Sequence, residues 1–332
     1  MNNINPYHYN KHIIMAIHAK TNNEIIQLQV FVGLAIIGLN FFFNQWFEAI
    51  RYYALAASIL IIGMPHGALD HKIYFKALHK EETMKTQIVF YAGYLLVVAV
   101  YAWLWYVQPF VGFLLFMLFT LYHFGQSDTE RLPLNGLLKQ LFILARGLSI
   151  AGLILFGSDP FYTSRIVESV TGVSLISIVY NFVTIEDLRL FFALLYPCIY
   201  LLGSFISKKV PLKSWLSLDA LVVPALFSMV DPIFAFALYF GLWHGYNHTK
   251  TMLDFLSSKN EQVGFGWFYK ETAVFSVISY TGLILIYFLV EAFGDEALLV
   301  AILFTLISVI TLPHMLVVEQ MYRAFDKTKI SE

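Results

Sequence analysis

The stretch that decides the fold is YYALAASILIIGMPHGALDH, residues 52–71. Its first part, residues 52–62, is almost entirely apolar, and its second part carries His66, Asp70 and His71. A run of about 20 predominantly apolar residues predicts a membrane-spanning helix. Ionisable side chains are expensive to bury in such a helix and mark a functional site. The stretch therefore predicts a membrane protein with a polar site inside it.

The composition extends this prediction to the whole chain. Of its 332 residues, 59% are hydrophobic and only 13% are charged, and the mean hydropathy is +0.69. These values predict an all-α, polytopic transmembrane helix bundle. The net charge of −1 and the scattered basic residues argue against nucleic acid as a partner. The single cysteine, Cys198, excludes a thiolate metal cluster, so any metal must be held by nitrogen or oxygen.

Ten segments have the length and apolarity of membrane spans and end at charged or turn residues. They are 27–46, 52–71, 87–107, 110–127, 137–157, 188–206, 215–230, 232–249, 268–291 and 297–319. The segment 161–189 has mixed polarity, which favours an interfacial or re-entrant helix, or an ordinary cap outside the membrane, over a further span.

The basic residues predict the orientation of these spans. They follow the second, fourth, sixth, eighth and tenth spans, and include Lys72, Arg131, Lys208, Lys250 and Arg323. The positive-inside rule then places both termini in the cytoplasm. We expect a polar cytoplasmic segment over 1–26, one transmembrane helical catalytic domain over 27–322 and a cytoplasmic tail over 323–332. The polar N-terminal residues lack the features of a signal peptide and are expected to be retained.

The histidines point to the nature of the site. Six of the ten lie in or at the end of a predicted span: His66, His71, His123, His244, His248 and His314. At about 1.5 Å per residue, four of them lie roughly 18–24 Å into a hydrocarbon core about 30 Å thick. These four are His66, His123, His244 and His248. The same count places His71 and His314 nearer the cytoplasmic face.

A metal centre is one explanation for this convergence. His244 and His248 are four residues apart, which places both rings on one face of a helix. With one histidine from each of two other spans, they form an imidazole set that suits Fe, Zn, Cu or Ni. The alternative is that the histidines form hydrogen bonds between packed helices.

Other polar and aromatic side chains accompany the histidines. Asp70 and Asp128 follow His66 and His123 by four and five residues, close enough to accept the second N–H of a ligand, although both could instead cap helix ends. Four aromatic residues flank the histidines and could contact a substrate or form an interfacial belt: Tyr122, Phe124, Trp243 and Tyr246.

Four motifs together resemble the Brp/Blh family of membrane β-carotene 15,15′-dioxygenases. They are PHGALDH at 65–71, YHFGQSD at 122–128, WHGYNH at 243–248 and PHMLVVEQM at 313–321. The resemblance implies four Fe(II) ligands, at positions His66, His123, His244 and His248. We expect five further side chains to orient those ligands from behind: Asp70, His71, Asp128, Asn247 and His314.

The resemblance also implies the reaction and its setting. The substrates would be β-carotene and O₂, and the products two molecules of all-trans-retinal. The protein would lie in the lipid bilayer of a bacterial cytoplasmic (inner) membrane, with a retinal-binding rhodopsin as the acceptor of the product. An apolar polyene could reach a buried site sideways from the bilayer without passing through water.

Three alternatives fit parts of the pattern. HGYNH at 244–248 matches one histidine box of lipid desaturases and hydroxylases, although their HxxHH boxes are absent. A transporter or proton channel could use the histidines, the aspartates and Glu319 as a relay, but these groups are predicted on one side of the membrane. A pair of histidines could also bind haem.

Overall fold

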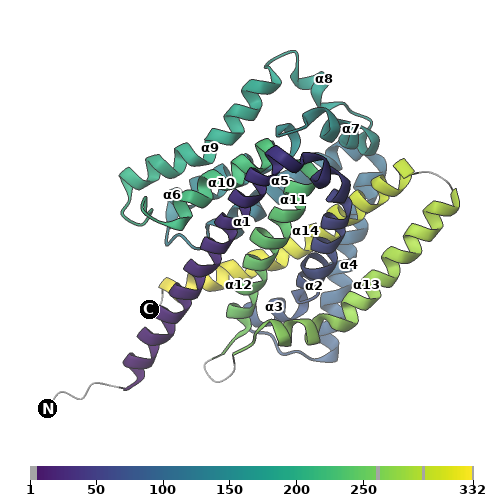
Figure 1. Cartoon of the computed structure of the whole chain (residues 1–332). Helices are drawn as coiled ribbons and strands as arrows, with labels where there is room; N and C mark the ends of the chain where they lie inside the picture. The colour runs from purple at the N-terminus through teal and green to yellow at the C-terminus, as the bar shows by residue number, and fades with distance from the viewer. Residues whose placement is uncertain (1–5, 259–261, 294–295, 331–332) are drawn as a thin grey trace.

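The computed structural model describes residues 6–258, 262–293 and 296–330, and every secondary-structure element in these ranges is helical (Figure 1). The predicted all-α class is therefore confirmed for the described part of the chain. The elements are α1 (Pro6–Ser58), η1 (Ile59–Gly63), α2 (Met64–Gly67), α3 (Asp70–Ala77), α4 (Met84–Val107), α5 (Pro109–Thr129), α6 (Gly136–Phe156), α7 (Pro160–Thr171), α8 (Leu175–Val179), α9 (Ile185–Ile206), α10 (Trp215–Met229), α11 (Pro232–Leu238), η2 (Tyr239–Gly245), α12 (Tyr246–Leu256), α13 (Phe265–Phe293) and α14 (Glu296–Ile330). The two η elements are π-helices.

Seven helical segments in the described residues are long and apolar enough to cross a membrane: Asn23–Ala77, Met84–Val107, Pro109–Thr129, Gly136–Phe156, Ile185–Ile206, Phe265–Leu289 and Ile302–Phe325. Large apolar side chains cover the outside of the bundle. Leu96 and Trp103 of α4 are 64% and 65% exposed, whereas Arg146 of α6 is 1% exposed. A surface of this kind fits lipid rather than water, and it supports the assignment of an integral membrane protein.

The predicted count of ten spans is not confirmed. The predicted spans 27–46 and 52–71 lie on one helical segment of 55 residues, Asn23–Ala77, which is kinked at Phe43 rather than divided by a loop. The predicted spans 215–230 and 232–249 fall on shorter elements. Asp231 lies between α10 and α11. It caps α11, since its Oδ1 accepts hydrogen bonds from the backbone N–H groups of Ile233 and Phe234.

The segments outside the predicted spans are also helical. Residues 161–189 form most of α7, all of α8 and the start of α9, and the two short helices lie at one end of the bundle (Figure 1). Helix α1 begins at Pro6 and α14 continues to Ile330, so the expected boundaries at 26 and 323 fall inside helices. The cytoplasmic location of the termini stays a prediction.

The two π-helices pack against each other, and glycines at their contact allow the close approach. A Cβ atom at Gly63 would lie 2.7 Å from the ring of Phe240, and one at Gly245 would lie 2.7 Å from Cγ2 of Ile62. Small residues let helix backbones meet in membrane proteins. Because His66 follows η1 by three residues and His244 lies within η2, this contact brings the two histidines to one place.

Helices α5 and α6 touch through their backbones. A Cβ atom at Gly125 would lie 1.9 Å from the carbonyl oxygen of Ile143, and one at Gly147 would lie 1.8 Å from that of Leu121. No larger residue fits either position without separating the helices. This crossing lies two residues from His123 and fixes that histidine in the interior.

Candidate metal centre

Five buried histidines from five different elements meet inside the bundle. None has a side chain more than 6% exposed, and α14, which supplies one of them, runs diagonally through the bundle in Figure 1. They are His66 of α2, His123 of α5, His244 of η2, His248 of α12 and His314 of α14. We call this set the histidine cluster.

His248 lies near all four of the other rings of the cluster. Its ring centroid is 4.9 Å from that of His123, 5.5 Å from His244, 5.6 Å from His314 and 5.7 Å from His66. The other four rings follow one another around it. Their neighbouring centroids lie 6.2 Å apart for His66 and His244, 4.9 Å for His244 and His123, 5.4 Å for His123 and His314, and 4.8 Å for His314 and His66.

The ring nitrogens of the cluster fit a metal ion. Four of them are buried and have no hydrogen-bond partner: Nε2 of His123, Nδ1 of His244, Nε2 of His248 and Nε2 of His314. A buried polar atom without a partner costs about 1–3 kcal/mol, so a single unsatisfied atom is a defect, whereas several in one cluster suggest a shared ligand. One ring nitrogen from each of His123, His248 and His314 lies within 4.8 Å of the other two. Convergent imidazoles of this kind suit Fe, Zn, Cu or Ni.

Asp70 contacts His314 rather than His66. Its Oδ1 accepts a hydrogen bond of 2.7 Å from Nδ1 of His314, and its Oδ2 accepts one of 3.0 Å from the hydroxyl of Tyr94. The Nδ1 of His66 donates instead to the carbonyl of Ile62, at 2.9 Å. The expected pairing assumed one continuous helix. A turn at residues 68–69 separates α2 from α3 and directs Asp70 towards α14.

Asp128 lies in a buried network of charges beside the cluster. Its Oδ2 accepts from Nε of Arg146 at 2.8 Å and from the hydroxyl of Tyr239 at 3.2 Å. Arg146 also donates to Asp219 at 3.0 Å, and Nε1 of Trp243 donates to the other oxygen of Asp219 at 2.6 Å. The expected contact of Asp128 with a ligand is thus replaced by a contact with Arg146, and the network reaches the cluster through Trp243, the residue before His244.

His71 and Asn247 were expected to orient ligands from behind. The structure does not bring His71 into the cluster, because its ring packs 5.4 Å from Phe275 and 6.2 Å from Tyr91. Asn247 is buried next to His248 in sequence, and its Oδ1 accepts hydrogen bonds from Gln29, at 2.9 Å, and from Arg131. These bonds join α12 to α1 and to the loop after α5.

The four aromatic candidates have different surroundings. The ring of Phe124 lies 4.4 Å from that of His244, in contact with the cluster. Trp243 is held by Asp219, and Tyr246 stacks on Phe265 at 5.1 Å. Tyr122 is half-buried on α5. Among the four, Phe124 is the residue whose ring packs directly on a histidine of the cluster.

Two further aromatic residues, outside the four predicted from the motifs, also contact the cluster. The ring of Phe240 stacks on that of His244 at 5.7 Å, and the hydroxyl of Tyr322 lies 3.5 Å from Nδ1 of His248. Phe240 is four residues before His244, and Tyr322 is eight residues after His314. Both spacings place the pair on one helix face, so helical periodicity could have found them.

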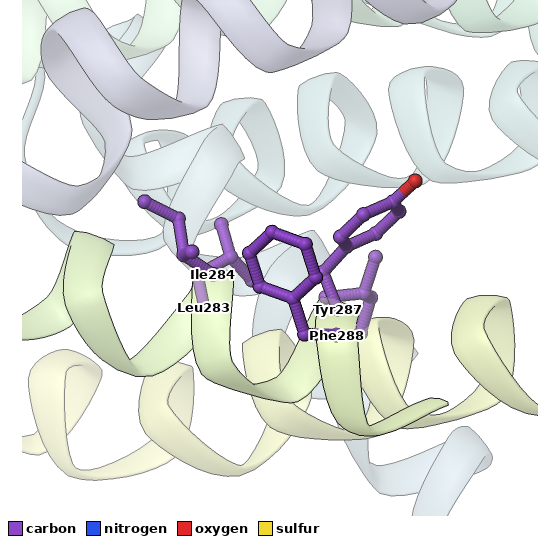
Figure 2. Close-up of a pocket in the computed structure, with 5 residues that line it drawn as sticks. Leu283, Ile284, Tyr287 and Phe288 are labelled. Carbon is purple, nitrogen blue, oxygen red and sulfur yellow. The ribbon is translucent and has the colours of Figure 1, made fainter. Parts of the chain in front are cut away.

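Two apolar grooves lie on the described surface, and neither is lined by a histidine. One, of about 390 Å³, is lined by Leu283, Ile284, Tyr287 and Phe288 of α13 and by Leu303 of α14 (Figure 2). The other, of about 300 Å³, lies along α1 around the kink at Phe43. Grooves lined by apolar side chains fit hydrocarbon chains better than polar solutes.

Comparisons with known proteins identify the same family that the sequence motifs resemble. The family model described as beta-carotene 15,15'-dioxygenase matches residues 57–322, which include every histidine of the cluster. A beta-carotene 15,15'-dioxygenase from an uncultured marine bacterium (66A03) is 26% identical over 280 residues, covering 80% of this chain and 92% of that protein.

A second relative comes from an archaeon. The probable beta-carotene 15,15'-dioxygenase Blh of Halobacterium salinarum is 25% identical over 211 residues, covering 60% of this chain and 61% of that protein. No solved structure matches the chain. Both relatives carry the name of a carotenoid dioxygenase rather than that of a desaturase, a transporter or a haem protein.

Proposed function

This chain belongs to the β-carotene 15,15′-dioxygenase family of enzymes, and we propose that it cleaves the central 15,15′ double bond of β-carotene with O₂ to give two molecules of all-trans-retinal. The observation that carries the proposal is the histidine cluster. Five imidazoles with four unsatisfied ring nitrogens lie in the interior of an apolar helix bundle. The cluster contains the four histidines that the sequence motifs imply as ligands.

The cofactor in this proposal is Fe(II), held by His66, His123, His244 and His248. Bound there, iron would supply the redox chemistry through which O₂ reacts with a carbon–carbon double bond. The residues around the cluster position the proposed ligands. His66 is oriented by the carbonyl of Ile62, which accepts its Nδ1–H and leaves Nε2 as the nitrogen with a lone pair. His244 is held between the rings of Phe124 and Phe240.

The surroundings of the cluster suit an apolar substrate. The rings of Phe124 and Phe240 contact His244 and give the cluster apolar neighbours. The outer faces of the helices are apolar, so a polyene dissolved in the bilayer can approach from the side. Neighbouring double bonds of the polyene are chemically similar, so cleavage at the centre requires a site that fixes how far the polyene enters.

The wider setting of the enzyme belongs to the same proposal. We place it in a bacterial inner membrane, with both termini cytoplasmic and residues 27–322 as one catalytic domain. Retinal is apolar and would leave into the bilayer, where a retinal-binding rhodopsin could accept it. Tyr122, Trp243 and Tyr246 are further candidates for contact with the substrate, after Phe124.

The test is expression of the full chain in cells that make β-carotene, followed by chromatography of the extracted pigments. We expect retinal from the wild type and none from His66→Ala or His248→Ala. The purified enzyme supplied with Fe(II) and O₂ should convert β-carotene to retinal alone. No product, or off-centre products only, would contradict the proposal. Two irons per chain would support a desaturase-like centre, and a Soret band would support haem.

A further inference from the structure

His314 occupies the remaining corner of the histidine cluster. The proposed ligand set contains His248 and three of the four other rings of the cluster. The fourth ring is His314, and its centroid lies 4.8 Å from that of His66 and 5.4 Å from that of His123. These separations are as short as those between the proposed ligands themselves. The position of the ring alone therefore does not distinguish His314 from a ligand.

The orientation of His314 is set from behind by a carboxylate. Its Nδ1–H donates to Oδ1 of Asp70 at 2.7 Å, and the hydroxyl of Tyr94 holds the other oxygen of Asp70 at 3.0 Å. Since the carboxylate can only accept, Nδ1 carries a proton, and in the neutral ring the lone pair is then on Nε2. A histidine whose outer nitrogen donates to a carboxylate is the usual arrangement of a metal ligand.

The inner nitrogen of His314 has nothing else to bind in the described structure. Its Nε2 is buried without a hydrogen-bond partner, as are Nε2 of His123 and Nε2 of His248. One ring nitrogen from each of these three residues falls within 4.8 Å of the other two. A side chain that merely supported the ligands would use this nitrogen for a hydrogen bond.

We propose that His314 binds the metal directly through Nε2, and that Asp70, with Tyr94 behind it, is the positioning residue that holds it there. The inference rests on the proposed metal site. It makes the centre one of five imidazoles, with a single position left on a six-coordinate ion. It also gives the motif at 313–321 a defined role, because α14 then supplies a ligand to a centre otherwise built from α2, α5, η2 and α12.

The experiment loads the detergent-purified full chain with Co(II), whose visible absorption reports the number and geometry of its ligands. His314→Gln removes the imidazole with little change in size, and Asp70→Asn removes the negative charge behind it. His71→Phe is the matched control, since His71 is a buried histidine five residues from His66 that packs on Phe275 outside the cluster.

We expect His314→Gln to change the shape of the Co(II) spectrum and His71→Phe to leave it unchanged. Asp70→Asn should keep the wild-type shape and weaken Co(II) binding by about 10- to 100-fold, as loss of a carboxylate behind a ligand does. In the His314→Gln background, Asp70→Asn should weaken binding by less than about threefold, because the two residues act as one unit.

The proposal is overturned if His314→Gln takes up Co(II) with the wild-type spectrum. Should that variant not fold, proton NMR of the Co(II)-loaded wild type gives the same answer. A strongly shifted imidazole N–H signal that disappears in Asp70→Asn supports ligation by His314, and its absence contradicts it. A wild-type chain that binds neither Co(II) nor Fe(II) would instead refute the metal site of the proposed function.

Discussion

Residues 65–71 and residues 122–128 each carry a histidine followed by an aspartate, and each supplies its histidine to the same cluster. Their aspartates have different partners. Asp70 accepts from His314, a member of the cluster, whereas Asp128 accepts from Arg146 and Tyr239. The comparison shows that spacing along the chain brought the two histidines to one site but did not determine what the carboxylates would bind.

The difference arises from what lies opposite each aspartate. Asp70 begins α3 after a turn and faces α14, which brings His314 within reach. Asp128 is near the end of α5, and the close crossing of α5 with α6 places Arg146 beside it. A buried arginine needs a carboxylate more than a neutral histidine does, because an unpaired charge is costly away from water.

Replacement of either His66 or His123 should abolish activity to the same extent, and this loss is the largest effect that we expect. We expect His66→Ala and His123→Ala each to lower retinal production by more than about 100-fold, since loss of a residue behind a ligand already costs about 10- to 100-fold. Retinal in extracts of β-carotene-producing cells measures the effect. His79→Asn is the control, because His79 is exposed and its φ of 51° suits asparagine. Activity retained in only one of the two variants would contradict the assignment of both histidines to one metal centre.

Removal of the charge of Asp128 should affect stability. Asp128 and Arg146 have side chains only 4% and 2% exposed, and Asp128→Asn leaves the arginine with Asp219 alone. We expect a loss of about 3 kcal/mol, typical of a broken buried ion pair. Thermal unfolding in detergent measures it. An Asp128→Asn variant with wild-type stability and weaker metal binding would show that Asp128 acts on the ligands after all.

Asp70→Asn should weaken iron binding rather than lower stability. A His314 that binds the metal through Nε2 is a neutral imidazole, so the substitution leaves no unpaired charge behind it. We expect iron binding to weaken by about 10- to 100-fold, with a much smaller change in unfolding temperature than Asp128→Asn produces. Iron content after dialysis against a chelator measures the first effect. A drop in stability equal to that of Asp128→Asn would remove the distinction between the two aspartates.

The smallest expected effects come from the tyrosines behind the aspartates. Tyr94 donates to Asp70 and Tyr239 donates to Asp128, so Tyr94→Phe and Tyr239→Phe delete matched hydrogen bonds. Each bond to a charged group is worth about 1.5–3 kcal/mol at most. Tyr94→Phe should weaken iron binding several-fold, and Tyr239→Phe should lower stability while iron binding is kept. The same two assays measure both variants, and interchange of the two outcomes would contradict the assignment.

Some of this structure follows from the sequence and some does not. Hydropathy predicts helices and lipid-facing surfaces, and helical spacing predicts that His244 and His248 share a face. The number of spans does not follow, because polar residues such as Gln45, Glu48 and Arg51 lie within the continuous helix α1, although such residues also occur in loops between spans. The partner of Asp70 lies 244 residues away, so only the packing of α14 determines it.

The π-helices have a consequence for how this chain tolerates change. A π-helix holds an extra residue relative to an α-helix, and η1 separates the long lipid-facing part of α1 from His66. The hydroxyls of Tyr269 and Tyr280 of α13 bind the carbonyls of Ile61 and Leu60 and so fasten this turn from outside. Deletion of one residue within 59–63 would remove the extra residue and leave an ordinary α-helical turn, with His66 on nearly the same face relative to α1. The wide turn of η1 thus absorbs one residue, so the chain can vary in length here without turning the histidine away from the cluster.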